Sequence, residues 1–227
     1  MTAPPPAGRN RLLPEPEALH ILQGAGLSVI PHRLARTPEE AAMAARDLGC
    51  PVAAKVVAHA LAHKSDVGGV ILNLATPEEA ATAFSTVRDR LAARVARLPF
   101  HGALIAKMAA PGGLEVILGM IRDPQFGPAV MFGLGGVFVE VYNDVVFRLP
   151  PLTEAEARTM LTEVKAARLL TGYRGFPPRD LESLAAGVCA LARLAQENPE
   201  IQEIDLNPLI AYERGYVIVD AKILVRP

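Results

Sequence analysis

Hydrophobic and polar residues follow the period of a helix in some segments and that of a strand in others. Helical and strand segments follow one another along the chain. Most of the helical segments can be recognised at their starts, where threonine or aspartate occupies the N-cap position. In the three segments that start with threonine, an acidic residue follows three positions later. In two of them proline occupies the first helical position. These patterns predict helices over residues 15–23, 38–48 and 77–98, a fourth after Thr153, and a fifth from Asp180 to about residue 197.

Short apolar runs between these helices predict strands. They span residues 27–30, 52–57, 69–74, 103–108, 114–121, 129–132, 137–142, 145–149, 202–206, 209–212 and 217–221. Turn residues at 142–144 and 213–215 join neighbouring runs as hairpins. Hairpins mixed with helices predict an α+β fold rather than a doubly wound parallel sheet.

The strongest interruption of this pattern is Pro111-Gly112-Gly113, which we expect to act as a hinge between two lobes. Residues 1–13 contain three consecutive prolines and are expected to form a flexible tail. The sequence therefore predicts an N-terminal lobe over residues 14–110 and a C-terminal lobe over residues 111–227.

Composition narrows the classes of function. Half of the residues (51%) are hydrophobic and the net charge is −1, which allows a sizeable core and disfavours nucleic-acid or polybasic membrane binding. No apolar run approaches the roughly 18 residues of a membrane span, and no secretory signal is recognisable. We expect a cytoplasmic protein. Cys50 and Cys189 lack metal or redox spacing and are expected to be buried thiols.

Lys55 lies inside the apolar run PVAAKVV and is followed by the polar loop AHKSDVGG. A lysine in a buried strand is costly unless its charge meets a partner, which an anion in a cleft would supply. Gly68 and Gly69 lack Cβ atoms, so backbone N–H groups can approach phosphate oxygens there. The stretch from Lys55 to Gly69 therefore predicts phosphate binding. It is not a Walker sequence, and a plain tight turn is an equal explanation of the glycine pair.

Acidic and amide side chains gather in the C-terminal run EIDLNPL. Strand alternation places Glu203, Asp205 and Asn207 on one face. A paired strand over residues 217–221 would bring Asp220 beside Asn207. Oxygen ligands of this kind suit magnesium, which takes few protein ligands and adds phosphate oxygens and waters. The alternative is a solvent-facing edge strand.

The glycine-rich run FGLGGVFVE is the third candidate for phosphate chemistry. It contains no full G-x-G-x-x-G, and it joins two expected strands rather than a strand and a helix. A dinucleotide-binding site is therefore disfavoured. The glycines are explained either by a turn or by contact with a substrate phosphate.

Several runs, in order, resemble the ATP-grasp domain of ADP-forming acyl-CoA synthetases. They are KVVAHALAHKSDVGGVILNL, EVILGMIRDPQFGPAVMFGLGGVFVEV, FRLPPL, LLTGYRG and EIDLNPL, and the resemblance extends from about Glu15 to Val225. It implies an ATP-grasp fold in which the nucleotide cleft lies between two lobes. It also implies a free-standing β-subunit that joins a CoA-binding α-subunit, expected as a heterotetramer.

The resemblance implies a phosphoryl relay. In this family acyl-CoA and phosphate give an acyl phosphate on the partner, and a partner histidine takes the phosphoryl group. A second phosphohistidine on a mobile loop then delivers it to ADP. His63 matches this second histidine, and imidazole is both a good nucleophile near neutral pH and a good leaving group when phosphorylated. Asp205 stands where the succinyl-CoA synthetases have a glutamate near the incoming phosphohistidine.

The resemblance also implies the groups that hold ATP or ADP with Mg²⁺. Lys55 matches the lysine that contacts the α- and β-phosphates, where it would neutralise charge during transfer. Gly68 and Gly69 match the glycine-rich phosphate loop. Asn207 and Asp220 match the magnesium ligands.

For the nucleoside, Glu115 matches the acidic residue that binds ribose hydroxyls. The backbone of Lys107, Met108 and Ala109 would face adenine. Many ATP-grasp proteins have an acidic or amide residue in place of Lys107, so adenine recognition here is expected through backbone groups.

Two other functions compete with an acyl-CoA synthetase subunit. One is an ATP-grasp ligase that joins a carboxylate to an amine or thiol through a direct acyl phosphate, which needs no phosphohistidine. The other is a non-catalytic nucleotide-sensing module that regulates a partner. The AHKSDVGG loop disfavours the first, and the full set Lys55, His63, Asn207 and Asp220 disfavours the second.

Overall fold

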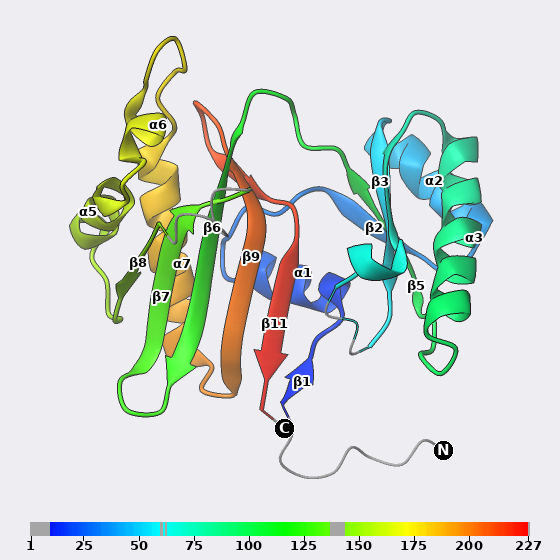
Figure 1. Ribbon diagram of the computed structural model, residues 1–227, viewed down its shortest axis with the longest axis horizontal. Coiled ribbons are helices and arrows are strands. Elements are labelled where there is room, and N and C mark those ends of the chain that lie inside the picture. The colour runs from blue at the N-terminus through cyan, green and yellow to red at the C-terminus, as the bar shows by residue number, and fades with distance from the viewer. Residues whose placement is uncertain (1–9, 60, 62, 137–143, 227) are drawn as a thin grey trace. The chain divides into compact units, whose positions relative to one another are not determined.

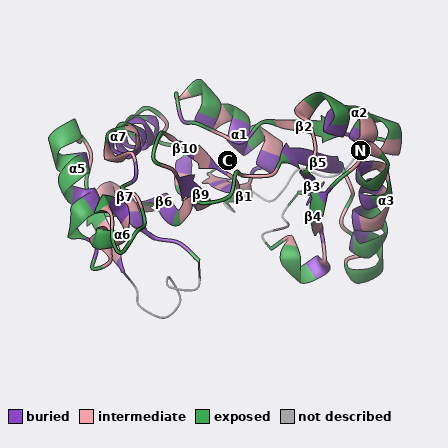
Figure 2. Ribbon diagram, turned by 90° about the horizontal axis from the view of Figure 1, so that it is seen from above, coloured by how far each residue is buried: buried purple, intermediate pink, exposed green. Residues whose placement is uncertain are grey.

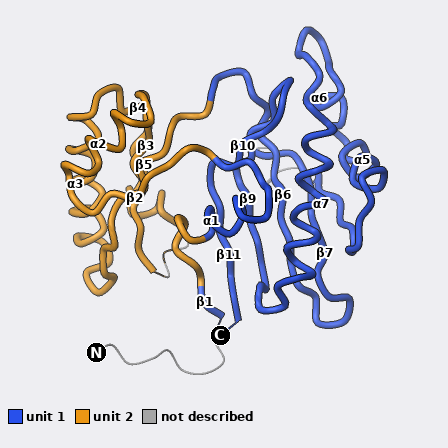
Figure 3. Tube along the Cα trace, turned by 180° about the vertical axis from the view of Figure 1, so that it is seen from behind, with its two compact units in different colours: residues 1–11, 18–29, 110–227 blue, residues 12–17, 30–109 orange. Residues whose placement is uncertain are grey.

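The computed structural model describes residues 10–226 apart from residues 60, 62 and 137–143 (Figure 1). Its strands form a seven-stranded and a four-stranded sheet, and every strand pair with a described register is antiparallel. The chain divides into two compact units (Figure 3). Unit 2 comprises Leu12–Glu17 and Ile30–Ala109, whereas Ala18–Val29 and the chain from Ala110 onward belong to unit 1.

Unit 2 is a four-stranded sheet with two helices packed side by side against it. In sheet order its strands are β2 (His32–Ala35), β5 (Gly102–Lys107), β3 (Val52–Val57) and β4 (Val70–Leu74). The helices are α2 (Pro38–Leu48) and α3 (Pro77–Arg94), and a 3-10 turn, η1 (Ser65–Val67), lies within the polar loop. Phe84, Val87 and Leu91 of α3 are buried in the core of this unit.

Unit 1 contains the seven-stranded sheet. Its strands in order are β1 (Arg11–Leu12), β11 (Ala221–Val225), β9 (Ile201–Ala211), β6 (Leu114–Asp123), β7 (Gly127–Leu134) and β8 (Val145–Arg148), and β10 (Tyr216–Ile218) also pairs with β9. Helix α7 (Leu181–Glu197) packs on β6 and β7, and α5 (Glu154–Glu163) packs on α7. The short α6 (Ala167–Thr171) follows α5, and α1 (Glu15–Gly24) contributes its residues from Ala18 onward.

The buried residues gather on the strands and on the inner faces of the helices (Figure 2). Helix α7 shows this most fully, since alanine and leucine side chains along it are buried. Cys189 of α7 is buried, as expected, and burial raises the pKa of its thiol. Cys50 is only half-buried, because it lies in the connection before β3. None of the described helices is long and apolar enough to cross a membrane.

The helix starts predicted from capping residues are confirmed. Thr37, Thr76 and Thr153 each accept a hydrogen bond from the backbone N–H three residues later, and Thr153 forms a full capping box with Glu156. Asp180 caps α7 through Ser183 and also accepts a 2.7 Å hydrogen bond from Gly215 N–H. These hydrogen bonds, with that from Gly215 foremost, lower the pKa of Asp180.

The strand expected at residues 27–30 is wrong. Only Val29 in this stretch makes a β-bridge, to Ile218, and the strand that enters the sheet is β2, just beyond Pro31. In β2 only Ala35 is buried, because this strand lies at the edge of its sheet. It therefore has no apolar alternation from which it could be recognised. The strand expected at residues 137–142 lies outside the described residues.

The C-terminal strands are also arranged differently from the prediction. Residues 202–206 and 209–212 were expected as two strands separated by Pro208, but β9 runs through both. The ladder between β6 and β9 shifts register between Val116 and Leu118, which leaves Asn207 and Pro208 in a bulge. A bulge tolerates proline, which has no N–H to give to the ladder. The single strand expected at 217–221 is divided into β10 and β11.

Candidate functional site

Lys55 lies in the middle of β3, where every residue is buried, and its charge is neutralised within unit 2. Its Nζ lies 2.7 Å from Glu15 Oε1, and the two side chains are only 6% and 4% exposed. The sequence predicted that an anion in a cleft would supply the partner. The structure corrects this, because the carboxylate of Glu15 supplies it from the first residue of α1.

Glu15 also binds the loop that carries the candidate histidine. Its second carboxylate oxygen, Oε2, lies 2.9 Å from Lys64 Nζ, and the Lys64 side chain is 11% exposed. Lys64 directly follows His63, which is exposed and has no regular secondary structure. The structure therefore brings Lys55 and Lys64 together on one buried carboxylate and leaves the neighbouring imidazole accessible.

The glycine pair closes the loop onto β3. Gly68 has a left-handed φ of 63° and donates to Ser65 O, and Gly69 N–H donates to Lys64 O at 2.8 Å. A Cβ on Gly69 would lie 2.3 Å from Val56 Cγ1, so no larger residue fits there without displacement. The tight turn thus accounts for both glycines. A phosphate-binding role for Gly68 and Gly69 stays a prediction.

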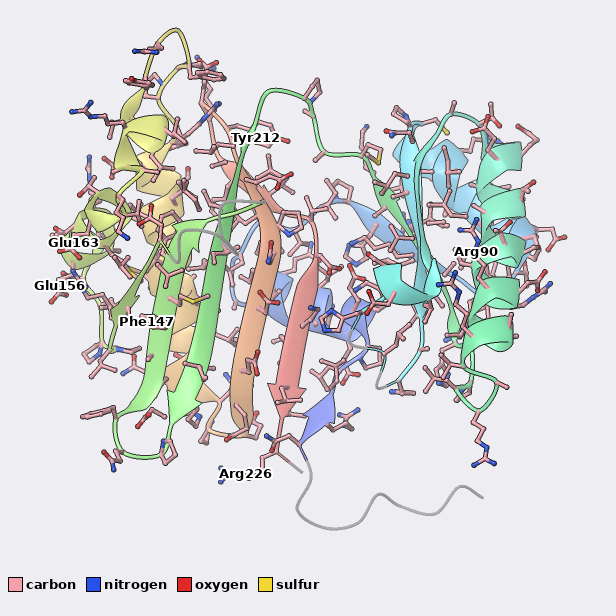
Figure 4. The ribbon with its side chains drawn as sticks, viewed as in Figure 1. Arg90, Phe147, Glu156, Glu163, Tyr212 and Arg226 are labelled. Atoms are coloured by element: carbon pink, nitrogen blue, oxygen red, sulfur yellow. The ribbon has the colours of Figure 1, made fainter. Side chains whose placement is uncertain are left out.

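Two arginines of α3 hold the C-terminal half of the same loop. Arg90, which Figure 4 labels on α3, donates from Nη1 to Gly68 O at 3.0 Å. Arg94 donates to the carbonyl of Asp66. Their i, i+4 spacing places both side chains on one face of the helix. Sequence reasoning missed these arginines, although this spacing on the helix after the loop was a usable signal.

Two histidine rings pack together near the other end of the loop. The rings of His59 and His101 meet edge to face with centroids 4.4 Å apart. His101 N–H also donates to Val57 O, the last residue of β3. These two contacts hold the chain at the end of β3, just before the segment that leads to the loop.

A separate cluster of candidate residues lies in unit 1, at the bulge of β9. Asn207 N–H donates to Asp220 O at 3.2 Å, and Val219 N–H donates to Pro208 O, so the bulge pairs with the connection between β10 and β11. The predicted proximity of Asp220 to Asn207 is thereby confirmed. Along β9, Ile204 and Leu206 are buried while Asn207 is exposed, so the predicted alternation is confirmed too.

Asp205 is partly exposed and faces a cation. Its Oδ2 lies 3.6 Å from Nζ of Lys222, which stands directly opposite on β11. The contact leaves the Asp205 carboxylate exposed enough to meet a ligand. Its role beside a phosphohistidine stays a prediction.

The pair of Asn207 and Asp220 fits magnesium by its chemistry. An amide oxygen and a carboxylate oxygen from adjacent backbone positions are hard oxygen ligands, and magnesium completes its octahedron with phosphates and waters. Among the described residues no three His, Cys, Asp or Glu side chains gather as a ready-made metal cage. This set therefore suits a metal that arrives with a nucleotide rather than a resident structural ion.

The residues expected around adenine lie at the end of β5. Lys107 N–H donates to Pro31 O and Met108 N–H donates to Pro51 O, so these two donors are used within unit 2. The Lys107 side chain turns away to Leu48 O, at the end of α2. Recognition of a base by Lys107, Met108 or Ala109 would thus use other backbone groups, and it stays a prediction.

Glu115, the residue expected at the ribose, is exposed near the start of β6. The glycine-rich run packs against it: Gly135 N–H donates to Glu115 O, and a Cβ on Gly136 would lie 3.0 Å from Glu115 Oε2. A Cβ on Gly135 would lie 2.9 Å from the Glu115 backbone. Close approach to β6 therefore explains these glycines, and the ribose role of Glu115 stays a prediction.

Comparison with known proteins gives a consistent result. Residues 6–225 match the family described as the ATP-grasp domain. The chain is 46% identical, over 95% of its length and 93% of the relative, to the β-subunit of acetate–CoA ligase (ADP-forming) I from Pyrococcus furiosus.

Two solved structures of the dinucleotide-forming acetyl-coenzyme A synthetase 1 of Ca. Korarchaeum cryptofilum have the same fold. One contains coenzyme A, acetyl-coenzyme A and a phosphorylated phosphohistidine segment in the site I orientation. It shares 44% identity and a TM-score of 0.87 over 95% of this chain and 94% of that one. The other contains coenzyme A and Mg-AMPPCP, with its phosphohistidine segment pointing towards the nucleotide-binding site. It shares 45% identity and a TM-score of 0.83 over 96% and 94%.

Proposed function

Because this chain belongs to the ATP-grasp family, as a β-subunit of the ADP-forming acetate–CoA ligase type, we propose that it moves a phosphoryl group between phosphohistidine and ADP. The overall reaction is acyl-CoA + ADP + phosphate ⇌ acid + CoA + ATP. The observation that carries the proposal is the loop itself, where an exposed His63 is anchored through Lys64 to the carboxylate that also holds Lys55.

Each transfer exchanges one bond to phosphorus for another. In the first, a neutral ring nitrogen of His63 attacks the phosphoryl group presented by the CoA-binding subunit, and the bond to the donor breaks. In the second, a β-phosphate oxygen of ADP attacks the same phosphorus, the P–N bond breaks and the imidazole leaves. Lys55 neutralises charge on the nucleotide phosphates, and Asp205 orients the incoming imidazole.

The remaining residues bind and orient the nucleotide. Asn207 and Asp220 would hold Mg²⁺, which when bound neutralises charge on the phosphates. Gly68 and Gly69 shape the phosphate loop, and Glu115 receives the ribose hydroxyls. Adenine lies against the backbone of Lys107, Met108 and Ala109. The acyl phosphate forms on a CoA-binding α-subunit, with which the chain assembles as a heterotetramer.

Reconstitution tests this function. We expect the chain alone to bind ADP but to form no ATP from acyl-CoA and phosphate, since the acyl chemistry belongs to the partner. Addition of the α-subunit should give ATP with at least one member of a panel of acyl-CoA thioesters, measured by coupled fluorescence. Nucleotide binding without turnover of any thioester would favour a nucleotide-sensing module, and acid-dependent ATP hydrolysis without CoA would favour a direct carboxylate ligase.

We expect Asp220→Ala to weaken ADP binding in the presence of magnesium by about tenfold, or about 1.4 kcal/mol. The physical reason is the loss of a carboxylate ligand next to Asn207. Calorimetric titrations with magnesium and with EDTA separate the metal-dependent part of the ADP affinity from the metal-independent part. The variant should match the wild type when EDTA removes the metal. Glu213→Ala is the matched control, an exposed carboxylate in the same unit. Equal magnesium-dependent affinity in both variants would contradict the assignment.

A further inference from the structure

One buried carboxylate joins two lysines of different kinds. Glu15 Oε1 lies 2.7 Å from Lys55 Nζ, and its Oε2 lies 2.9 Å from Lys64 Nζ. Lys55 belongs to the rigid strand β3, whereas Lys64 belongs to the loop and directly follows His63. All three residues lie in unit 2.

Burial of this triad reduces the screening of the Glu15–Lys64 pair by water, compared with an ordinary surface ion pair. Exposed pairs are weak because water screens them and long side chains lose entropy. Here the carboxylate is 4% exposed and the Lys64 side chain 11% exposed, so screening is reduced. Lys64 O also accepts from Gly69 N–H, which fixes the backbone of the lysine on the other side.

We propose that Glu15 is a positioning residue which, through Lys64, docks the His63 segment on the unit that carries the nucleotide lysine. The inference deepens the proposed function and rests on it. A segment that serves two reaction centres needs a defined resting place at each. The Glu15–Lys64 pair defines the place at the nucleotide side, next to Lys55. Arg90 and Arg94 hold the carbonyls of Gly68 and Asp66, so the tether at Lys64 acts nearest to the histidine.

The test separates the two half-reactions in the complete assembly with the CoA-binding subunit. One half-reaction is transfer of labelled phosphate from ATP to His63. The other is labelling of His63 from acyl-CoA and labelled phosphate. We expect Lys64→Gln to slow the first roughly tenfold, as for loss of a largely buried charge pair, and to leave the second within about twofold of wild type. Lys64→Arg, which keeps the charge, should restore most of the rate.

Two further variants sharpen the comparison. Lys165→Gln removes an exposed lysine from unit 1 and should leave both half-reactions unchanged. Glu15→Gln should slow the nucleotide half-reaction as Lys64→Gln does. It also removes a carboxylate that contacts buried Lys55, so the Lys64 variants decide the question if the Glu15→Gln protein folds poorly.

Hydrogen exchange of the same proteins gives a readout that does not need turnover. Amides of residues 63–67 should exchange faster in Lys64→Gln than in wild type and Lys165→Gln, because the tether that limits local opening is gone. Equal slowing of both half-reactions, or wild-type exchange and rates in Lys64→Gln, would overturn the docking role while leaving the relay intact. A wild-type assembly that acquires no label on His63 would instead overturn the relay, and the exchange comparison alone would then decide whether Glu15 docks the loop.

Discussion

The variant His63→Ala is expected to lose acyl-CoA-dependent ATP formation by roughly 10⁴-fold or more, because it removes the group that carries the phosphoryl moiety. Its affinity for ADP should stay within about twofold of wild type, since the imidazole is exposed and lies outside the proposed phosphate and ribose contacts. Coupled ATP synthesis with the α-subunit measures the first quantity, and calorimetry measures the second.

The control for this experiment is His20→Ala, which removes an exposed imidazole from α1. It should retain full activity and should still acquire acid-labile phosphate, whereas His63→Ala should acquire none. Loss of both ADP binding and activity in His63→Ala would indicate damage to the fold instead. Full ATP synthesis by His63→Ala in the presence of the partner would refute the phosphohistidine role.

Local signals predicted the helices well because capping is a local interaction. Thr37 and Thr76 each accept a hydrogen bond from the backbone N–H three residues later, so a stretch of four residues contains the whole capping interaction. Strand β2 was missed for the opposite reason. Its edge position leaves three of its four residues at least partly exposed, so its pairing with β5 depends on distant residues that no local pattern records.

The two clusters of candidate residues differ in how far the sequence could reveal them. Asn207 and Asp220 were predicted as neighbours because a hairpin and period-two alternation determine their geometry. The partner of Lys55 was not predicted, since Glu15 lies 40 residues away. Because burying an unpaired lysine is costly, the sequence correctly predicted an anionic partner for Lys55. It did not indicate whether the protein or the ligand would provide that anion.

At the bulge of Asn207 and Pro208 the strand prediction was wrong, but the same position holds a candidate functional residue. The sequence predicted two strands, one on each side of Asn207 and Pro208, and proline is a residue that interrupts a ladder. In the structure the ladder accommodates Pro208 by a register shift, and β9 continues. Bulges re-aim side chains, which is why they occur next to active sites. The same residue that misled the strand assignment thus leaves Asn207 exposed beside Asp220.

For the second large effect we expect Lys55→Met to reduce ATP synthesis by about 10²–10³-fold, the usual cost of one charge-stabilising group. The same change should destabilise the protein by about 2 kcal/mol, because buried Glu15 loses one of the two lysines that lie against it in the described part of the chain. This is less than the roughly 3–5 kcal/mol for a fully isolated buried charge, because Lys64 still lies 2.9 Å from Glu15. Urea denaturation measures the stability, and steady-state kinetics with the partner measure the activity.

The double variant Lys55→Met/Glu15→Gln separates the two roles of Lys55. A neutral amide beside methionine no longer demands a cation, so the double variant should recover most of the lost stability. It should recover none of the lost activity, since the nucleotide phosphates still lack their lysine. Equal stability of the single and double variants would show that Glu15 is not the group that Lys55 stabilises. Recovery of ATP synthesis together with stability would show that Lys55 serves the fold and not the nucleotide.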